Sequence, residues 1–165
     1  MLDDVLAKVE QIDAQRNELN KELFTLIKDE IVSVLEKYPE FIAIRWTQSV
    51  PSFNDGDPCV FSFDEAHYVT NEDASLKEDF DFDYSETVDI EGCLYKLYES
   101  EGNWDYELKE RVYPTSEAKE KANKLSEINK VLYTIQGLLE EQFGSNAEVI
   151  VTRDNIIVND YSCGY

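Results

Sequence analysis

The segment Ser52–Cys59, S-F-N-D-G-D-P-C, combines residue types that could support chemistry. Asp55 and Asp57 flank a glycine, and paired carboxylates can hold a divalent cation or act as general acid and base. A metal-dependent nuclease usually also presents a basic residue to the scissile phosphate. None lies between Arg45 and Lys77. A metal-dependent enzyme centred on Asp55 and Asp57 is therefore an alternative and not the main interpretation.

Other residues that could do chemistry are isolated. His67 is the only histidine, so we expect neither a zinc site nor a Cys–His nucleophile, and we expect His67 to be a half-exposed loop residue. Asp79, Asp81 and Asp83 suit the first, third and fifth positions of a calcium loop, but Tyr84 stands where such a loop needs glycine. The sequence predicts no catalytic residue, no metal site and no cofactor.

The Ser52–Cys59 segment is more typical of a connection between strands. Asn54, Asp55 and Gly56 form a strong turn signal, and Asp57 before Pro58 favours an extended backbone. We interpret the segment first as structural, with a functional site as the alternative.

Charge is concentrated in the middle of the chain. The net charge is −21, and residues 54–110 contain eighteen acids and three bases, a net charge of −15. Nucleic acid is an unsuitable direct ligand, because it is itself anionic. A cation or a protein with a basic surface or channel is the expected partner.

An acidic insertion, residues 64–92, contains the densest charge. In an extended chain Asp79, Asp81 and Asp83 face one side and Tyr84 the other, which gives a row of carboxylates about 7 Å apart. Such a row resembles the charge spacing of a nucleic-acid strand. The alternative is a solvated loop that only keeps the protein soluble. The predicted partner-binding residues are Asp79, Asp81, Asp83, Tyr84, Glu86, Asp89, Trp104 and Tyr106.

Two long helices are expected, over residues 1–38 and 115–143. Apolar residues recur at steps of three and four in the first, interrupted by Arg16, and a polar residue at such a position often sets register between helices. Thr115 is expected to cap the second helix and Gly144 to end it. Both helices are longer than a compact globule of 165 residues is wide. A homodimer through the long helices and a helical hairpin within one chain are both open.

Strands are expected over residues 41–48 and 59–63, and at 93–99 as a strand or short helix. Residues 148–152 and 155–159 predict a C-terminal β-hairpin. The fold class is therefore α+β, a single domain over residues 1–165 with helices on one face of an antiparallel sheet. The chain contains no run of apolar residues long enough to span a membrane, and its three widely spaced cysteines are typical of a reducing cytoplasm.

The stretch R-W-T-Q-S-V-P-S-F-N-D-G-D-P-C-V-F, residues 45–61, resembles the W-T-Q-Y-T-P-x-F-N-D-G-[DE]-P-C-x-F signature of small acidic bacteriophage proteins. Val-Thr-Arg-Asp-Asn at residues 151–155 resembles the V-T-R-D-G close of that family, with Asn155 in place of glycine, and Ser49-Val50 also departs. The resemblance implies phage origin and carries no known activity. The matching positions are Trp46, Gln48, Phe53, Asn54, Asp55, Gly56, Asp57 and Cys59.

These features predict a non-enzymatic acidic protein that binds and inhibits a host enzyme or defence complex in the host cytoplasm. Nucleases, polymerases and ATP-dependent proteases have basic surfaces or channels that a DNA-mimicking or channel-blocking protein could occupy. The alternatives are the metal-dependent enzyme and a phage assembly or scaffold component that works through the long helices.

Overall fold

The structure, a computed structural model, describes residues 2–52, 56–70, 103–113 and 115–162. The helices are α1 (Leu2–Lys37), α4 (Ser116–Thr134) and α5 (Gln136–Phe143). The strands are β1 (Phe41–Ser49), β2 (Ser62–Phe63), β3 (His67–Thr70), β4 (Asn103–Asp105), β5 (Glu110–Val112), β6 (Ala147–Thr152) and β7 (Ile156–Asp160). The predicted α+β class is confirmed, as are the long N-terminal helix and the C-terminal β-hairpin, β6–β7.

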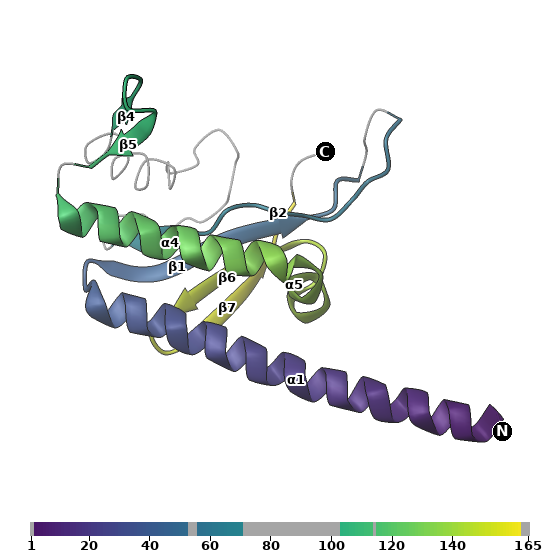
Figure 1. Ribbon diagram of the computed structural model, residues 1–165. Helices are drawn as coiled ribbons and strands as arrows, with labels where there is room; N and C mark the ends of the chain where they lie inside the picture. Colours follow the sequence, from purple (N-terminus) through teal and green to yellow (C-terminus); the bar gives the residue numbers. More distant parts are fainter. Residues whose placement is uncertain (1, 53–55, 71–102, 114, 163–165) are drawn as a thin grey trace.

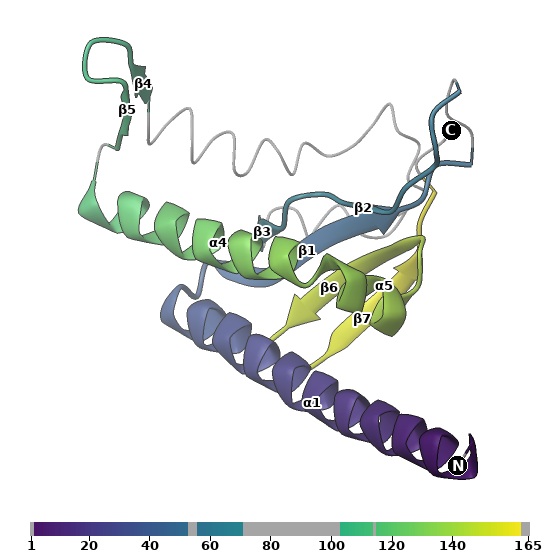
Figure 2. The ribbon, with the colours of Figure 1, turned by 45° about the vertical axis from the view of Figure 1, so that its right-hand side comes forward.

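The main sheet is antiparallel and is organised around β1. Its strands run in the order β2, β1, β6, β7, and β3 also pairs with β1. Figures 1 and 2 show α1 and α4 lying over the same face of this sheet. The core between the layers contains alternate residues of β1 and β6, among them Ile44, Trp46, Val149 and Val151, which is the period expected of strands that bury one face.

Aromatic residues close the end of the core where α1 turns into β1. The rings of Phe41 and Tyr68 stack with centroids 4.0 Å apart, and Tyr38 meets Phe41 edge-on. The Tyr68 hydroxyl donates a hydrogen bond to the backbone carbonyl of Lys121, which fastens β3 to α4. The packing joins α1, β1, β3 and α4 at one corner.

Helix α1 is about 54 Å long at 1.5 Å per residue, and only its C-terminal part is buried. Ile31, Val34 and Leu35 belong to the core, whereas the N-terminal half extends beyond the sheet (Figure 1). Part of this long helix therefore projects beyond the globular part of the chain.

The single helix expected over residues 115–143 is wrong, because Ile135 divides it into α4 and α5. Ile135 has a ψ of 16°, and its N–H is shared between the carbonyls of Val131 and Leu132. Thr134 donates its hydroxyl proton back to the Lys130 carbonyl, a contact that often bends helices, and Gly137 follows. The expected ends are confirmed: Thr115 caps α4 through the N–H of Ala118, and Gly144 follows α5.

Two expectations for residues 59–67 need correction. The strand expected over residues 59–63 is reduced to Ser62–Phe63, and His67 lies in β3 opposite Arg45 instead of in a loop. The hairpin β4–β5 was not expected. Residues 93–99 lie outside the described part of the chain.

An ion pair joins the α1–β1 corner to α4. Lys121 Nζ contacts the carboxylates of Glu40 and Glu117. Burial alone raises the pKa of Glu40, but the hydrogen bond from Lys121, a backbone hydrogen bond and the charge of Lys121 together outweigh this effect, so the pKa of Glu40 is lowered. Burial alone lowers the pKa of Lys121, and its two carboxylate partners raise it overall.

We expect Glu40→Gln to lower the free energy of unfolding at about pH 7 by less than about 1 kcal/mol, since the pair is half exposed. The pKa of Glu40 is lowered from 4.5 in the folded state, so its contribution is complete above that value and is lost as the pH falls through the folded value. Urea unfolding should therefore separate the variant from the wild type at about pH 7 and show them converging as the pH falls below 4.5 and through the lowered pKa of Glu40. Glu36→Gln, at an exposed acid of α1, is the control. A difference that stays constant across this range would contradict the prediction.

Candidate functional site

Trp46 and Gln48, the tryptophan and glutamine of the phage-like signature, are buried and structural. The Gln48 amide donates hydrogen bonds to the backbone carbonyls of Leu139, at 3.0 Å, and Gly144, at 2.6 Å. Its carbonyl oxygen accepts a hydrogen bond from Trp46 Nε1 at 3.2 Å. One side chain therefore ties β1 to the C-terminal end of α5 and also fixes the indole ring.

The rest of the signature forms the connection from β1 to β2. Gly56 has a φ of +95°, which only glycine adopts without strain, and this agrees with the predicted turn. Asp57 and Cys59 are exposed. Phe53, Asn54 and Asp55 lie outside the described residues, so the distance between the carboxylates of Asp55 and Asp57 does not enter the argument.

Arg153, in the second phage-like motif, also has a structural position. Its Nη2 donates hydrogen bonds to the carbonyl oxygens of Leu35 and Phe41. The first of these lies in the last turn of α1, where the helix dipole is negative and favours a cation. Arg153 thereby locks the end of α1 to the start of β1.

A buried ion pair lies on the sheet face opposite the helices, and the sequence analysis missed it. Arg45 Nε donates to a carboxylate oxygen of Glu148, and the two side chains are 13% and 7% exposed. The second oxygen of Glu148 accepts from Asn159 Nδ2 at 2.8 Å. The alternation of apolar and polar residues along β1 and β6 was the only available signal, since 103 residues separate the partners.

The predicted partner-binding residues divide into two groups. Trp104 and Tyr106 are described, and both are exposed, by 49% and 85%. The structure places them on residues 103–112, where Figures 1 and 2 show the hairpin β4–β5 standing away from the sheet. The other members, five acids and Tyr84, lie outside the described residues: Asp79, Asp81, Asp83, Tyr84, Glu86 and Asp89.

The turn of this hairpin is built by its own residues. Asp105 Oδ1 accepts hydrogen bonds from the N–H groups of Glu107 and Leu108 at 2.8 and 2.9 Å, and Lys109 takes a φ of 53°. The side chains of Trp104, Tyr106 and the 63% exposed Leu108 lie at the surface around this turn. Exposed aromatic and apolar side chains on a projecting hairpin are typical of a protein-binding surface.

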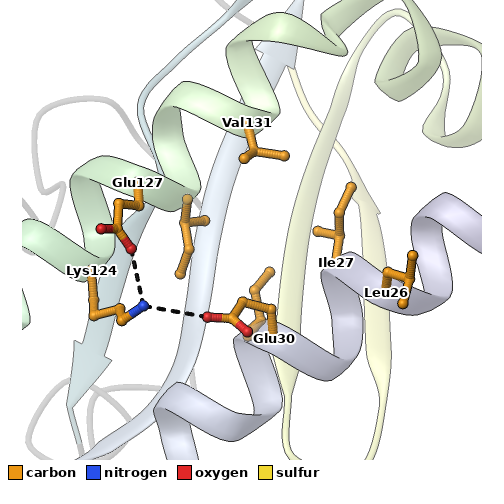
Figure 3. Close-up of a pocket in the computed structure, with 8 residues that line it drawn as sticks. Leu26, Ile27, Glu30, Lys124, Glu127 and Val131 are labelled. Atoms are coloured by element: carbon orange, nitrogen blue, oxygen red, sulfur yellow. Dashed lines mark hydrogen bonds and ion pairs between the residues drawn. The ribbon is translucent and has the colours of Figure 1, made fainter.

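A small apolar pocket separates α1 from α4 (Figure 3). Its volume is about 240 Å³, which is below the 300–1,000 Å³ or so of a usual ligand site. Lys124 lies at one end and contacts Glu127 at 3.0 Å and Glu30 at 3.6 Å. These partners raise the pKa of Lys124. The other lining residues are Leu26, Ile27, Ile31, Ile128 and Val131.

The projecting part of α1 exposes a row of large apolar residues, which we call the α1 stripe. The described residues of the helix expose Leu2 by 80%, Leu19 by 63% and Leu26 by 66%. A helix face of this kind is normally covered by another element, because apolar surface is unfavourable in water. The stripe consists of the exposed Leu2, Val5, Val9, Ile12, Leu19 and Leu26 and the half-buried Leu23, with Arg16 in the middle. Leu6, which is 61% exposed, lies beside it.

Comparisons with protein-family models, curated proteins and solved structures find no match. Within the described ranges, no group of three or more His, Cys, Asp and Glu side chains is placed to hold a metal ion. The described helices include none that is long and apolar enough to cross a membrane.

Proposed function

We propose that this chain is a non-enzymatic acidic protein that binds and inhibits a host enzyme or defence complex through a basic surface or channel of that target. The observation that carries the proposal is the exposed aromatic hairpin of residues 103–112 on a chain with a net charge of −21. The resemblance to phage proteins makes a host protein, in the host cytoplasm, the expected target. Nucleases, polymerases and ATP-dependent proteases present the required basic channels.

Charge and aromatic contacts have separate tasks in this mechanism. The negative charge of residues 54–110 attracts a basic surface over a distance and speeds encounter, with a strong dependence on salt. Trp104 and Tyr106 then bury their rings against the target, as residues of these types do at the energetic centres of interfaces. A homodimer through the long helices belongs to the same proposal, since it would present two acidic segments.

We expect a pull-down from host lysate to capture a defined target at about 0.1 M salt and to lose it at about 1 M salt. The double variant Trp104→Ala/Tyr106→Ala should weaken capture about tenfold or more. Its matched control is Tyr133→Ala, which removes a 65% exposed aromatic residue from α4. Equal loss in the variant and the control would contradict a role for the hairpin.

A separate set of variants tests whether the acidic segment contributes to capture of the target. Asp79→Asn/Asp81→Asn/Asp83→Asn should weaken capture, whereas Glu141→Gln/Asp154→Asn/Asp160→Asn, at exposed acids outside that segment, should leave it nearly unchanged. Capture that survives high salt and is indifferent to the position of the neutralised acids would contradict the electrostatic mechanism.

The projecting half of α1 favours a second candidate, a phage assembly or scaffold component. Such a component would form large oligomers through its helices, whereas the inhibitor proposal requires no more than a dimer. Sedimentation velocity distinguishes the two.

A further inference from the structure

The α1 stripe follows the seven-residue repeat of a coiled coil over residues 2–26. Leu2, Val9, Arg16 and Leu23 occupy one seam position of the repeat. Val5, Ile12, Leu19 and Leu26 occupy the other, so that steps of three and four alternate without a break. This two-position pattern, with Leu6 at one flanking position, is typical of the seam of a helix that packs on one other helix.

We propose that the α1 stripes of two copies pack against each other as an antiparallel two-stranded coiled coil, with Leu2 beside the partner's Leu26. The inference rests on the homodimer of the proposed function and specifies its orientation and register. The occupant of the stripe is thus a second copy of this chain.

The register uses the whole exposed length of the helix. Ile27 already packs against the core, and Leu26 lines the pocket between α1 and α4. In the antiparallel register Leu2 faces the partner's Leu26, Val5 faces the partner's Leu23, and Val9 faces the partner's Leu19. These contacts, each formed twice in the dimer, cover every apolar residue of the stripe except Ile12, which faces the partner's Arg16. The coiled-coil seam then continues directly into the seam between α1 and the globular part.

Arg16 decides between the two orientations. In a parallel coil in register, Arg16 would face the partner's Arg16 across the seam, with two like charges out of water. In the antiparallel coil it packs against the partner's Ile12 and lies next to the partner's Asp13. Asp13 is already 3.9 Å from Arg16 within one chain. The centre of the coil therefore gathers two arginines and two aspartates, with no net charge.

The residues that flank the seam agree with this orientation. Reversal of one chain brings Lys8 beside the partner's Glu22, twice in the dimer, and pairs of opposite charge at these positions select partners and orientation. A parallel coil would set Lys8 beside the partner's Asp13 and leave Glu22 without a basic neighbour at the matching position. Lys8 therefore has an acidic neighbour in either orientation, and only the antiparallel coil also gives Glu22 a basic one.

Long-range repulsion points the same way. Residues 1–26 carry six acids and three bases, so residues 27–165 hold −18 of the −21 charges. A parallel coil would bring two such bodies together at one end. The antiparallel coil holds them at opposite ends of a rod of about 37 Å, which is several times the screening length of about 8 Å in physiological salt.

Sedimentation equilibrium tests whether the stripe joins two copies. We expect the full chain to be a dimer at tens of micromolar, Leu19→Glu on the stripe to be a monomer, and Ala14→Glu on the outer side of the same helix to remain a dimer. Circular dichroism checks that each variant keeps its helices. A monomeric wild type, or an assembly larger than a dimer, would overturn the inference.

Disulfide trapping tests the orientation separately. In a background in which Cys59, Cys93 and Cys163 are changed to Ser, Val9→Cys and Leu19→Cys are made in different chains. An antiparallel coil crosslinks a mixture of the two and neither variant alone, whereas a parallel coil crosslinks each variant with itself. Self-crosslinking alone would overturn the orientation and leave the inhibitor proposal intact.

Charge reversal tests the same orientation in the chain with its native cysteines. We expect Glu22→Lys to weaken the dimer by about threefold to tenfold, and Lys8→Glu/Glu22→Lys to restore it. A parallel coil predicts no effect of Glu22→Lys and no rescue, so failure of the rescue counts against the antiparallel register. The salt-dependent capture of a host protein is measured independently, and its failure would sink the inhibitor proposal without touching the dimer.

Discussion

Replacing Arg45 by methionine should lower the free energy of unfolding by about 3–5 kcal/mol, one of the two largest effects we expect in this protein. Arg45 and Glu148 form a buried ion pair on the sheet face opposite the helices. Methionine fills a similar volume but leaves the Glu148 carboxylate buried without its guanidinium. The contact from Asn159 supplies only a neutral donor to one of its two oxygens.

A double-mutant cycle separates the loss of the pair from the loss of packing. Glu148→Leu alone should also destabilise, whereas Arg45→Met/Glu148→Leu should recover much of the loss, because no unpaired charge remains buried. Urea unfolding of the four proteins gives the coupling energy. Additive losses, or a loss below about 1 kcal/mol for Arg45→Met, would show that the pair behaves as a solvated surface contact.

The second large effect is expected at Gln48. Gln48→Leu keeps most of the side-chain volume but removes the partner of the Leu139 and Gly144 carbonyls and of the Trp46 indole N–H. A buried polar group without its partner costs about 1–3 kcal/mol, so we expect a loss of at least about 3 kcal/mol in the free energy of unfolding.

Two further variants make the Gln48 experiment specific. Gln142→Ala removes an exposed glutamine from α5 and should change stability by less than about 0.5 kcal/mol. Gln48→Ala should cost more than Gln48→Leu, because it adds a cavity. Trp fluorescence should shift in both Gln48 variants as the indole loses its fixed partner. A Gln48→Leu protein as stable as the wild type would contradict the structural role of the signature.

The sequence was informative where its pattern was long and regular. The period of α1, the hydroxyl of Thr115, the glycine at 144 and the alternation around residues 153–155 were enough to place α1, both ends of the second helical region and the β6–β7 hairpin. The break at Ile135 was missed, because the apolar period continues through it and only the weak preferences of Thr134 and Gly137 oppose a helix. The hairpin β4–β5 was missed because its strands are three residues long.

The candidate site was predicted only in part. Trp104 and Tyr106 are exposed, as a binding surface requires, and their role in binding stays a prediction. Gln48 and Arg153 were marked by resemblance, and nothing in the sequence revealed that their partners are backbone carbonyls. Local patterns cannot show this, since Gln48 and its acceptors are 91 and 96 residues apart.

The central place of β1 has a consequence for how the protein is made. β1 pairs along its length with β6, yet about a hundred residues must be synthesised after β1 before β6 exists. A ribosome adding about 5–20 residues per second would need several seconds or more to deliver the partner strand. During that interval one edge of β1 presents unpaired backbone N–H and C=O groups, so the sheet cannot be completed before β6 has been synthesised.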